Sequence, residues 1–81
     1  MLSKLPVVSG RDLIKFLKKL GYEVVRQRGS HVRLRKETES GIHNITIPYH
    51  EEIAKGTLNA ILNDISKWNN IPKEELIKRL K

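Results

Sequence analysis

Residues 22–48 read YEVVRQRGSHVRLRKETESGIHNITIP, and most of the predicted sheet follows from them. The first six residues of this stretch are rich in aromatic and β-branched side chains, which favour a strand. An Arg-Gly-Ser turn signal follows at 28–30, and a second extended run begins at His31. A polar turn at 37–41 leads to a third strand at 42–47, which a proline ends. The stretch therefore predicts a hairpin followed by a third strand, in an antiparallel sheet.

The side chains of these strands separate into an apolar and a basic face, because strand residues alternate between the two sides. Val32 and Leu34 point to the core side of the second strand, and Ile45 and Ile47 point to that of the third. His43 shares this parity, so we expect it in a structural or rim position. The opposite face of the second strand is basic and wet, and carries His31, Arg33 and Arg35.

The first amphipathic helix is predicted before the sheet. Ser9 can cap its start, with Asp12 three positions on, and Gly21 supplies the residue that most easily ends it. Its apolar positions recur at helical spacing and are Leu13, Phe16, Leu17 and Leu20. Its polar face carries four cations, which are Arg11, Lys15, Lys18 and Lys19.

A second main helix is predicted after the sheet, with the small residues Gly56 and Thr57 at its start. Its apolar positions are Leu58, Ile61, Leu62 and Ile65. We expect it to end where residues 68–70, Trp-Asn-Asn, break the pattern. Pro72 then marks a short C-terminal helix. The order predicts an α+β fold, with two main helices on one face of a three-stranded antiparallel sheet.

The amino-acid composition indicates one folded domain and excludes several classes of protein. The 81-residue chain fits one domain, and 38% hydrophobic residues are too many for a chain that stays disordered. The absence of cysteine excludes disulfides and thiolate metal sites. No apolar run has the length of a signal-peptide core or a membrane span, so we expect a cytoplasmic protein with no membrane partner.

The net charge of +7 is concentrated in one part of the chain. Residues 1–36 hold ten basic residues against two acidic ones, a net of +8, whereas the remainder has a net of −1. Such an asymmetry attracts polyanions and raises their encounter rate. Nucleic acid is therefore the first partner to consider, although an anionic membrane or an acidic protein would satisfy the same charge.

His31 is the candidate catalytic residue. It follows the predicted turn, and nearby guanidinium groups come from Arg26, Arg28, Arg33 and Arg35. A neutral imidazole can take the proton from a ribose 2′-hydroxyl, while guanidinium groups hold the phosphate and offset the charge that grows on it. The simpler interpretation is a surface histidine on a solvated strand.

Two other segments suit phosphate chemistry. His50 lies on the loop before the second main helix. Three roles are open to it: a second acid–base group, an RNA contact, or an ordinary hydrogen-bonding residue. Lys55, Gly56 and Thr57 would place a cation, bare amides and a hydroxyl at a helix N-terminus, which favours phosphate; an ordinary helix start gives the same pattern. The spacings of the three histidines match no metal motif, and no cofactor is expected.

Four short segments spread over about residues 9–65 together resemble the HicA toxins of bacterial and archaeal toxin–antitoxin systems. They are Leu20-Gly21-Tyr22, Arg26-Gln27-Arg28-Gly29-Ser30-His31, Ile47-Pro48-Tyr49-His50 and Lys55-Gly56-Thr57-Leu58. The Gly-Ser-His element is the most specific of them. Two carboxylates, Glu51 and Glu52, depart from the basic loop expected there.

The resemblance implies a fold similar to a double-stranded-RNA-binding domain and a toxin that cleaves mRNA without a metal. It maps the catalytic residue onto His31 and implies a HicB-type antitoxin that blocks this histidine. His50, from its own position on the loop, is the candidate for an auxiliary role. A single domain is expected over residues 1–81, with a core at about 9–65 and a helical extension at about 66–81. The residues expected to contact RNA are Arg11, Lys15, Lys18, Lys19, Arg26, Arg28, Ser30, Arg33, Lys55, Gly56 and Thr57.

Two rival functions remain open from the sequence. A non-catalytic RNA-binding domain of the same fold would use the same basic surface, with His31 as a contact only. A sequence-specific DNA binder would need a recognition helix, for which Asn59 and Asn63 are candidates. The strand-rich middle of the chain argues against the DNA binder.

Overall fold

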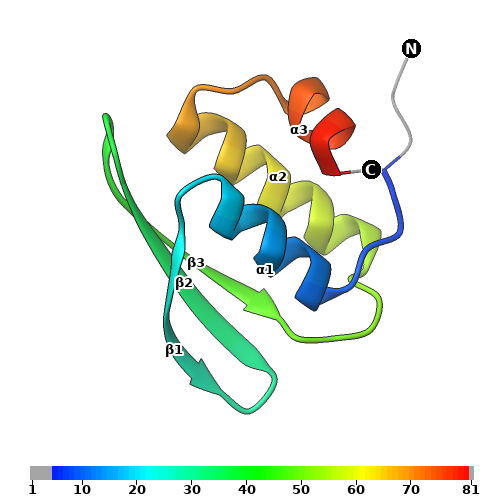
Figure 1. Ribbon diagram of the computed structural model, residues 1–81. Helices are drawn as coiled ribbons and strands as arrows, with labels where there is room; N and C mark the ends of the chain where they lie inside the picture. Colours follow the sequence, from blue (N-terminus) through cyan, green and yellow to red (C-terminus); the bar gives the residue numbers. More distant parts are fainter. Residues whose placement is uncertain (1–4, 81) are drawn as a thin grey trace.

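A computed structural model describes residues 5–80 of the chain. The elements are α1 (Gly10–Lys19), β1 (Glu23–Arg28), β2 (His31–Thr38), β3 (Gly41–Pro48), α2 (Lys55–Asn69) and α3 (Lys73–Leu80). Figure 1 shows α1 and α2 side by side over one face of the sheet, with α3 on the side of α2 that faces away from the sheet. The predicted antiparallel sheet with two main helices on one face and a short third helix is confirmed.

The sheet is antiparallel in the order β1-β2-β3, so β2 is its central strand. Val32 and Leu34 of β2, and Ile45 and Ile47 of β3, are at most 7% exposed. They face buried helical side chains, among them Leu13, Leu17, Leu58, Leu62 and Ile65. The predicted alternation is confirmed, and the opposite face of the sheet stays open to solvent.

The first helix begins and ends as its sequence predicts. Ser9 is the N-cap, and its Oγ accepts a hydrogen bond of 3.0 Å from the backbone N–H of Asp12. The chain turns into β1 directly after the helix. Gly21 makes that turn with a φ of +104°, a conformation that other residues rarely adopt.

The second helix runs further than the sequence predicts. Trp68 and Asn69, which were expected to break it, are its last two residues, and Asn70 ends it in the left-handed conformation. Trp68 stacks on His43, with ring centroids 4.9 Å apart and planes within 8° of parallel. The contacts of Trp68 and Asn69 with the sheet outweigh the weak helix propensities of these residue types.

A partly buried chain of hydrogen bonds joins the end of α2 to the sheet. Lys36 Nζ donates to Asn69 Oδ1 at 2.5 Å, and Asn69 Nδ2 donates to the Tyr22 hydroxyl at 2.8 Å. The hydroxyl is then free to donate its own proton to His43 Nδ1, 2.6 Å away. This direction requires a neutral His43 with an unprotonated Nδ1. His43 therefore has the structural position that its parity predicts.

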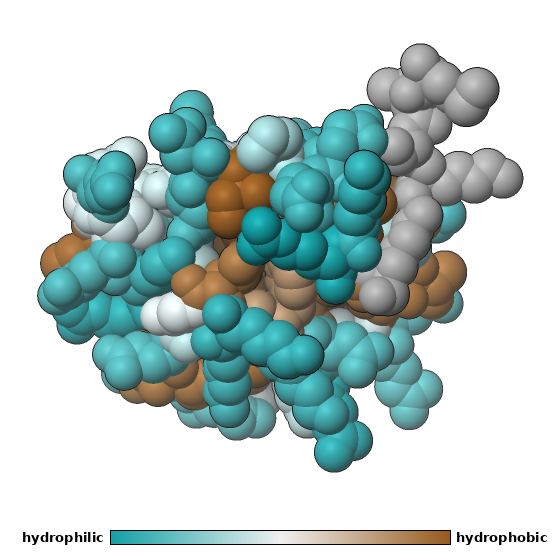
Figure 2. Space-filling model, turned by 45° about the horizontal axis from the view of Figure 1, so that its top comes forward, coloured by the Kyte–Doolittle hydropathy of each residue, from teal (hydrophilic) through white to brown (hydrophobic). Residues whose placement is uncertain are grey.

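The third helix packs against α2 and buries Leu76 and Ile77. In the view of Figure 2, hydrophilic residues cover most of the surface, and hydrophobic residues are visible only in small, separate patches. Within residues 5–80, no helix is both long enough and apolar enough to cross a membrane.

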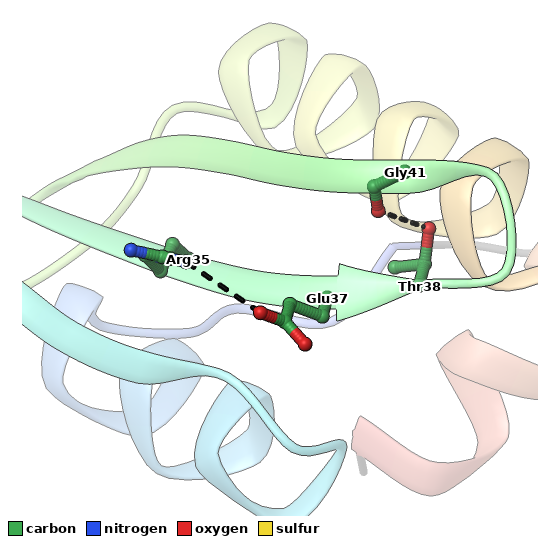
Figure 3. Close-up of polar contacts among 4 residues, drawn as sticks. All are labelled: Arg35, Glu37, Thr38 and Gly41. Carbon is green, nitrogen blue, oxygen red and sulfur yellow. Dashed lines mark hydrogen bonds and ion pairs between the residues drawn. The ribbon is translucent and has the colours of Figure 1, made fainter.

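The turn between β2 and β3 is fixed by its own polar side chains (Figure 3). Thr38 Oγ1 donates to the Gly41 carbonyl at 2.7 Å and accepts from the Ser40 backbone N–H at 3.1 Å. Arg35 and Glu37 form an ion pair of 3.8 Å on the open face beside this turn. Both partners are well exposed, so the pair contributes little to stability.

Acidification should destabilise the fold through His43. Burial lowers the pKa of this imidazole from its usual value near 6.5, and Asp64 opposes the shift in part. The unfolded chain therefore binds the proton at a higher pH than the folded chain does. As a result, the free energy of unfolding should fall as the pH drops below about 6.5.

Urea denaturation at several pH values between about 7.5 and 5 measures this dependence. His43→Gln keeps an acceptor for Tyr22 but does not titrate, so it should flatten the dependence. His31→Gln, which removes an exposed histidine outside this chain of hydrogen bonds, is the control for the loss of one imidazole. An unchanged slope in the His43 variant would contradict the assignment.

Candidate functional site

His31 stands at the end of the β1–β2 hairpin. Residues 29 and 30 form the turn, and Arg28 pairs directly with His31 across it. Gly29 has a φ of +58°, which a two-residue hairpin turn requires and which glycine adopts at no steric cost. The first residue of β2 is thereby fixed opposite an arginine.

A β-bulge in β1 decides which face its arginines occupy. The ladder pairs Val24 with Leu34 and then Arg26 with Arg33, so Val25 is an extra residue between them. Leu34 points to the core, and without the extra residue Arg26 would point to the same side as Val24. With the bulge, Arg26 and Arg28 share the open face with Arg33 and His31. We call the surface of these four residues the histidine face.

The charges of the histidine face are strongly unbalanced. Arg26 lies directly opposite Arg33, and like charges at such positions destabilise a sheet. The acidic residues of the open face, Glu23 and Glu37, lie toward its other end, beside Arg35. An anion bound at the histidine face would relieve the repulsion between the arginines.

A second group of cations lies on the helical side of the sheet. Arg11, Lys15 and Lys18 of α1 line a groove between α1 and β1, of about 320 Å³. Lys19 lines a different hollow, next to Phe16 and Arg79. The α1 cations and the histidine face are thus on opposite sides of the sheet. The other cations of residues 1–36 lie in α1, β1 and β2, except Lys4, which is outside the described residues.

The loop after β3 is hydrogen-bonded both to the β1–β2 turn and to the start of α1. The Tyr49 backbone N–H donates to the Ser30 carbonyl at 2.6 Å, and the Gly10 N–H donates to the His50 carbonyl at 2.8 Å. His50 lines a hollow of about 340 Å³ together with Ser9, Arg11, Tyr49 and Glu51. Backbone hydrogen bonds of Tyr49 and His50 therefore hold this loop against both the turn before His31 and the start of α1.

The start of α2 is open to solvent. The first helical hydrogen bond runs from Leu58 N–H to the Ala54 carbonyl at 2.9 Å, so the amides of Lys55, Gly56 and Thr57 have no partner within the helix. All three residues are exposed. Gly56 and Thr57 lie in the first turn, at the helix start where they were expected, and the N-cap is Ala54, which has no hydrogen-bonding side chain.

Two residues that matter to this site were not singled out from the sequence. Tyr49 is an exposed aromatic residue between the hairpin turn and His50; its place in the Pro-Tyr-His segment was the available signal. Gly10 is buried against the end of β3. Nothing in the sequence around it indicates that contact. Among residues 5–80, no group of three or more His, Asp and Glu side chains is arranged to hold a metal ion.

Comparison with models of protein families matches residues 10–66 to the HicA toxin of bacterial toxin–antitoxin systems. The match covers more than half of the chain, from the start of α1 into the last part of α2, and leaves α3 outside. Comparison with curated proteins and with solved structures gave no match.

Gly10→Ala should destabilise the protein, because the added Cβ would collide with the Pro48 carbonyl oxygen and lie 2.9 Å from the Tyr49 Cα. We expect a loss of about 1–3 kcal/mol in the free energy of unfolding, measured by chemical denaturation. Gly56→Ala is the matched control, because nothing lies within 4 Å of its added Cβ. Equal stabilities for the two variants would contradict the close approach of α1 to β3.

Proposed function

The chain belongs to the family of HicA toxins of bacterial toxin–antitoxin systems, and on that premise we propose that it is a ribonuclease that cleaves mRNA with His31 as its catalytic residue. The observation that carries the proposal is the exposed imidazole of His31, paired with Arg28 at the end of a row of guanidinium groups. RNA is a polyanion that suits such a surface. An open face also admits a long RNA chain.

In the proposed reaction, the neutral imidazole of His31 takes the proton from a ribose 2′-hydroxyl. The 2′ oxygen forms a bond to the adjacent phosphorus, the bond from phosphorus to the 5′ oxygen breaks, and the leaving oxygen takes a proton. Arg26, Arg28 and Arg33 offset the negative charge that grows on the phosphate oxygens. Solvent reaches this open surface and can supply the proton, so His50 has only an auxiliary role.

The other cations are proposed to hold RNA along its backbone. Phosphate contacts position a nucleic acid without specifying its sequence. The proposed contacts are Arg11, Lys15, Lys18 and Lys19 on α1, Ser30 at the turn, and Lys55, Gly56 and Thr57 at the start of α2. The proposed protein partner is a HicB-type antitoxin that covers His31 and neutralises the histidine face; a complex that left this face open would contradict that role.

His31→Ala tests the catalytic role. The side chain is exposed, so its loss should change the free energy of unfolding by less than about 0.5 kcal/mol. Cleavage of a long RNA should fall by roughly 100- to 10,000-fold, the usual contribution of a positioned general base. His50→Ala should cause a smaller loss. The time course of RNA degradation is measured with a chelator present, so that a contaminating metal nuclease cannot contribute.

The outcome also separates the proposal from its rival. If His31→Ala cuts as fast as the parent, His31 is not the catalytic residue. If the parent binds RNA and does not cut it under any condition that keeps it folded, the non-catalytic RNA-binding function is the better account. Expression of the parent, and not of the His31 variant, should be toxic to a host cell.

The salt dependence of binding tests the phosphate contacts. Each phosphate neutralised on a single strand contributes about −0.7 to the slope of log affinity against log salt concentration, because counterions are released. Lys15→Ala and Arg33→Ala should each make the slope shallower by about that amount. Lys67→Ala, an exposed cation near the other end of α2, is the matched control. A salt-independent affinity would mean that these cations are only solvated.

A further inference from the structure

Tyr49 is the one aromatic residue of this chain that is well exposed. The four aromatic residues all lie within residues 5–80: Phe16 and Tyr22 are buried, and Trp68 is half-buried in its stack with His43. Tyr49 is 46% exposed. A single exposed apolar side chain needs no explanation by itself, so the surroundings of the ring decide what it indicates.

Tyr49 borders the groove between α1 and β1, whose lining combines apolar side chains with cations. Ile14, Val24 and Val32 contribute apolar lining, and Gln27 is the uncharged polar residue. The charged lining residues are all cations, namely Arg11, Lys15 and Lys18. None of the ion pairs seen among residues 5–80 uses these three cations.

The backbone of Tyr49 is held in place from two sides. Its N–H donates to the Ser30 carbonyl on the hairpin turn, and its Cα packs against Gly10 at the start of α1. A tyrosine side chain has only two rotatable bonds, so a ring on a fixed backbone loses little conformational entropy when a ligand covers it. The ring is thus prepared for a flat ligand that carries negative charge beside it.

We propose that Tyr49 and this groove form a stacking subsite for one unpaired base of single-stranded RNA, with Arg11, Lys15 and Lys18 contacting the neighbouring phosphates. Aromatic side chains bind single strands by stacking on bases, and cations follow the backbone of the strand. The bases of a double helix are stacked on each other and cannot occupy such a subsite. This inference rests on the proposed function in taking RNA as the ligand, and it adds the substrate class.

The position of the subsite relative to His31 gives a second argument for a single strand. The groove lies on the helical side of the sheet, whereas His31 lies on the open side. Ser30, which binds the Tyr49 backbone, directly precedes His31, so only the hairpin turn separates the two surfaces. A flexible single strand can pass around this turn and contact both, and a stiff duplex cannot.

Binding is tested in the His31→Ala background, so that the RNA is not consumed. The probes are a labelled, unstructured RNA of about 12 nucleotides and the same RNA in a duplex with its complement. Fluorescence anisotropy gives the affinity of each. Tyr49→Leu keeps an apolar side chain over the groove but removes the flat ring, and Tyr49→Phe keeps the ring.

Tyr49→Leu should weaken binding of the single strand by roughly 5- to 150-fold, which corresponds to the loss of one stacked base. Tyr49→Phe should bind like the Tyr49 parent, and the affinity for the duplex should not depend on residue 49. Ile42→Ala is the matched control, because Ile42 is equally exposed but lies at the far end of the open face. Melting temperatures confirm that each variant is folded.

The subsite is overturned if Tyr49→Leu binds the single strand as well as its parent does, if it weakens binding of single strand and duplex equally, or if the protein binds neither RNA. These results are distinct from failure of the proposed cleavage, which is measured on the chain that retains His31. If the chain with His31 cuts RNA but Tyr49→Leu does not change the affinity for the single strand, the nuclease function stands and the subsite is overturned. If that chain does not cut RNA but Tyr49→Leu weakens binding of the single strand, the subsite stands and the nuclease function is overturned.

Discussion

The alternation of side chains along β2 sets both the core of this protein and its open basic surface. β2 pairs with both of the other strands, and its Val32 and Leu34 are buried under the helices while His31 and Arg33 point to solvent. A slip of one residue would bury a guanidinium group without a partner and expose an aliphatic side chain. The register of β2 therefore fixes the core and the histidine face together, because a change of register would disrupt both.

The two ends of the sheet differ in how their polar groups are satisfied. Near the β2–β3 turn, a partly buried chain of hydrogen bonds runs from Lys36 to His43, and the turn has its own side-chain bonds. Near the β1–β2 turn, Arg26 faces Arg33, and no ion pair seen among residues 5–80 includes either of them. The first end stabilises the fold and allows the second end to keep a repulsion that an anionic ligand would relieve.

Periodicity in the sequence predicts what depends on local geometry: the elements, the faces of β2 and β3, and most helical core positions, although it missed the buried Ile14 and included Leu20, which is only partly buried. It does not predict Val25 as a bulge, the contact of Gly10 with the end of β3, or the continuation of α2 through Trp68, because each depends on a neighbour distant in sequence. The cations of residues 1–36 illustrate the limit. Their excess is visible in the sequence, but their division between two sides of the sheet follows from how α1 packs, and the roles of the site residues stay predictions.

The bulge at Val25 links the protection of an edge strand to the chemistry of the site. β1 is an edge strand with no buried residue, and an edge of this kind can pair with strands of other molecules. A bulge and outward-pointing charges both oppose such pairing. Here the same extra residue that disturbs the edge turns Arg26 and Arg28 toward His31. A straight β1 would lose both properties at once: its edge would become more open to other strands, and Arg26 would point to the side of the sheet opposite to His31.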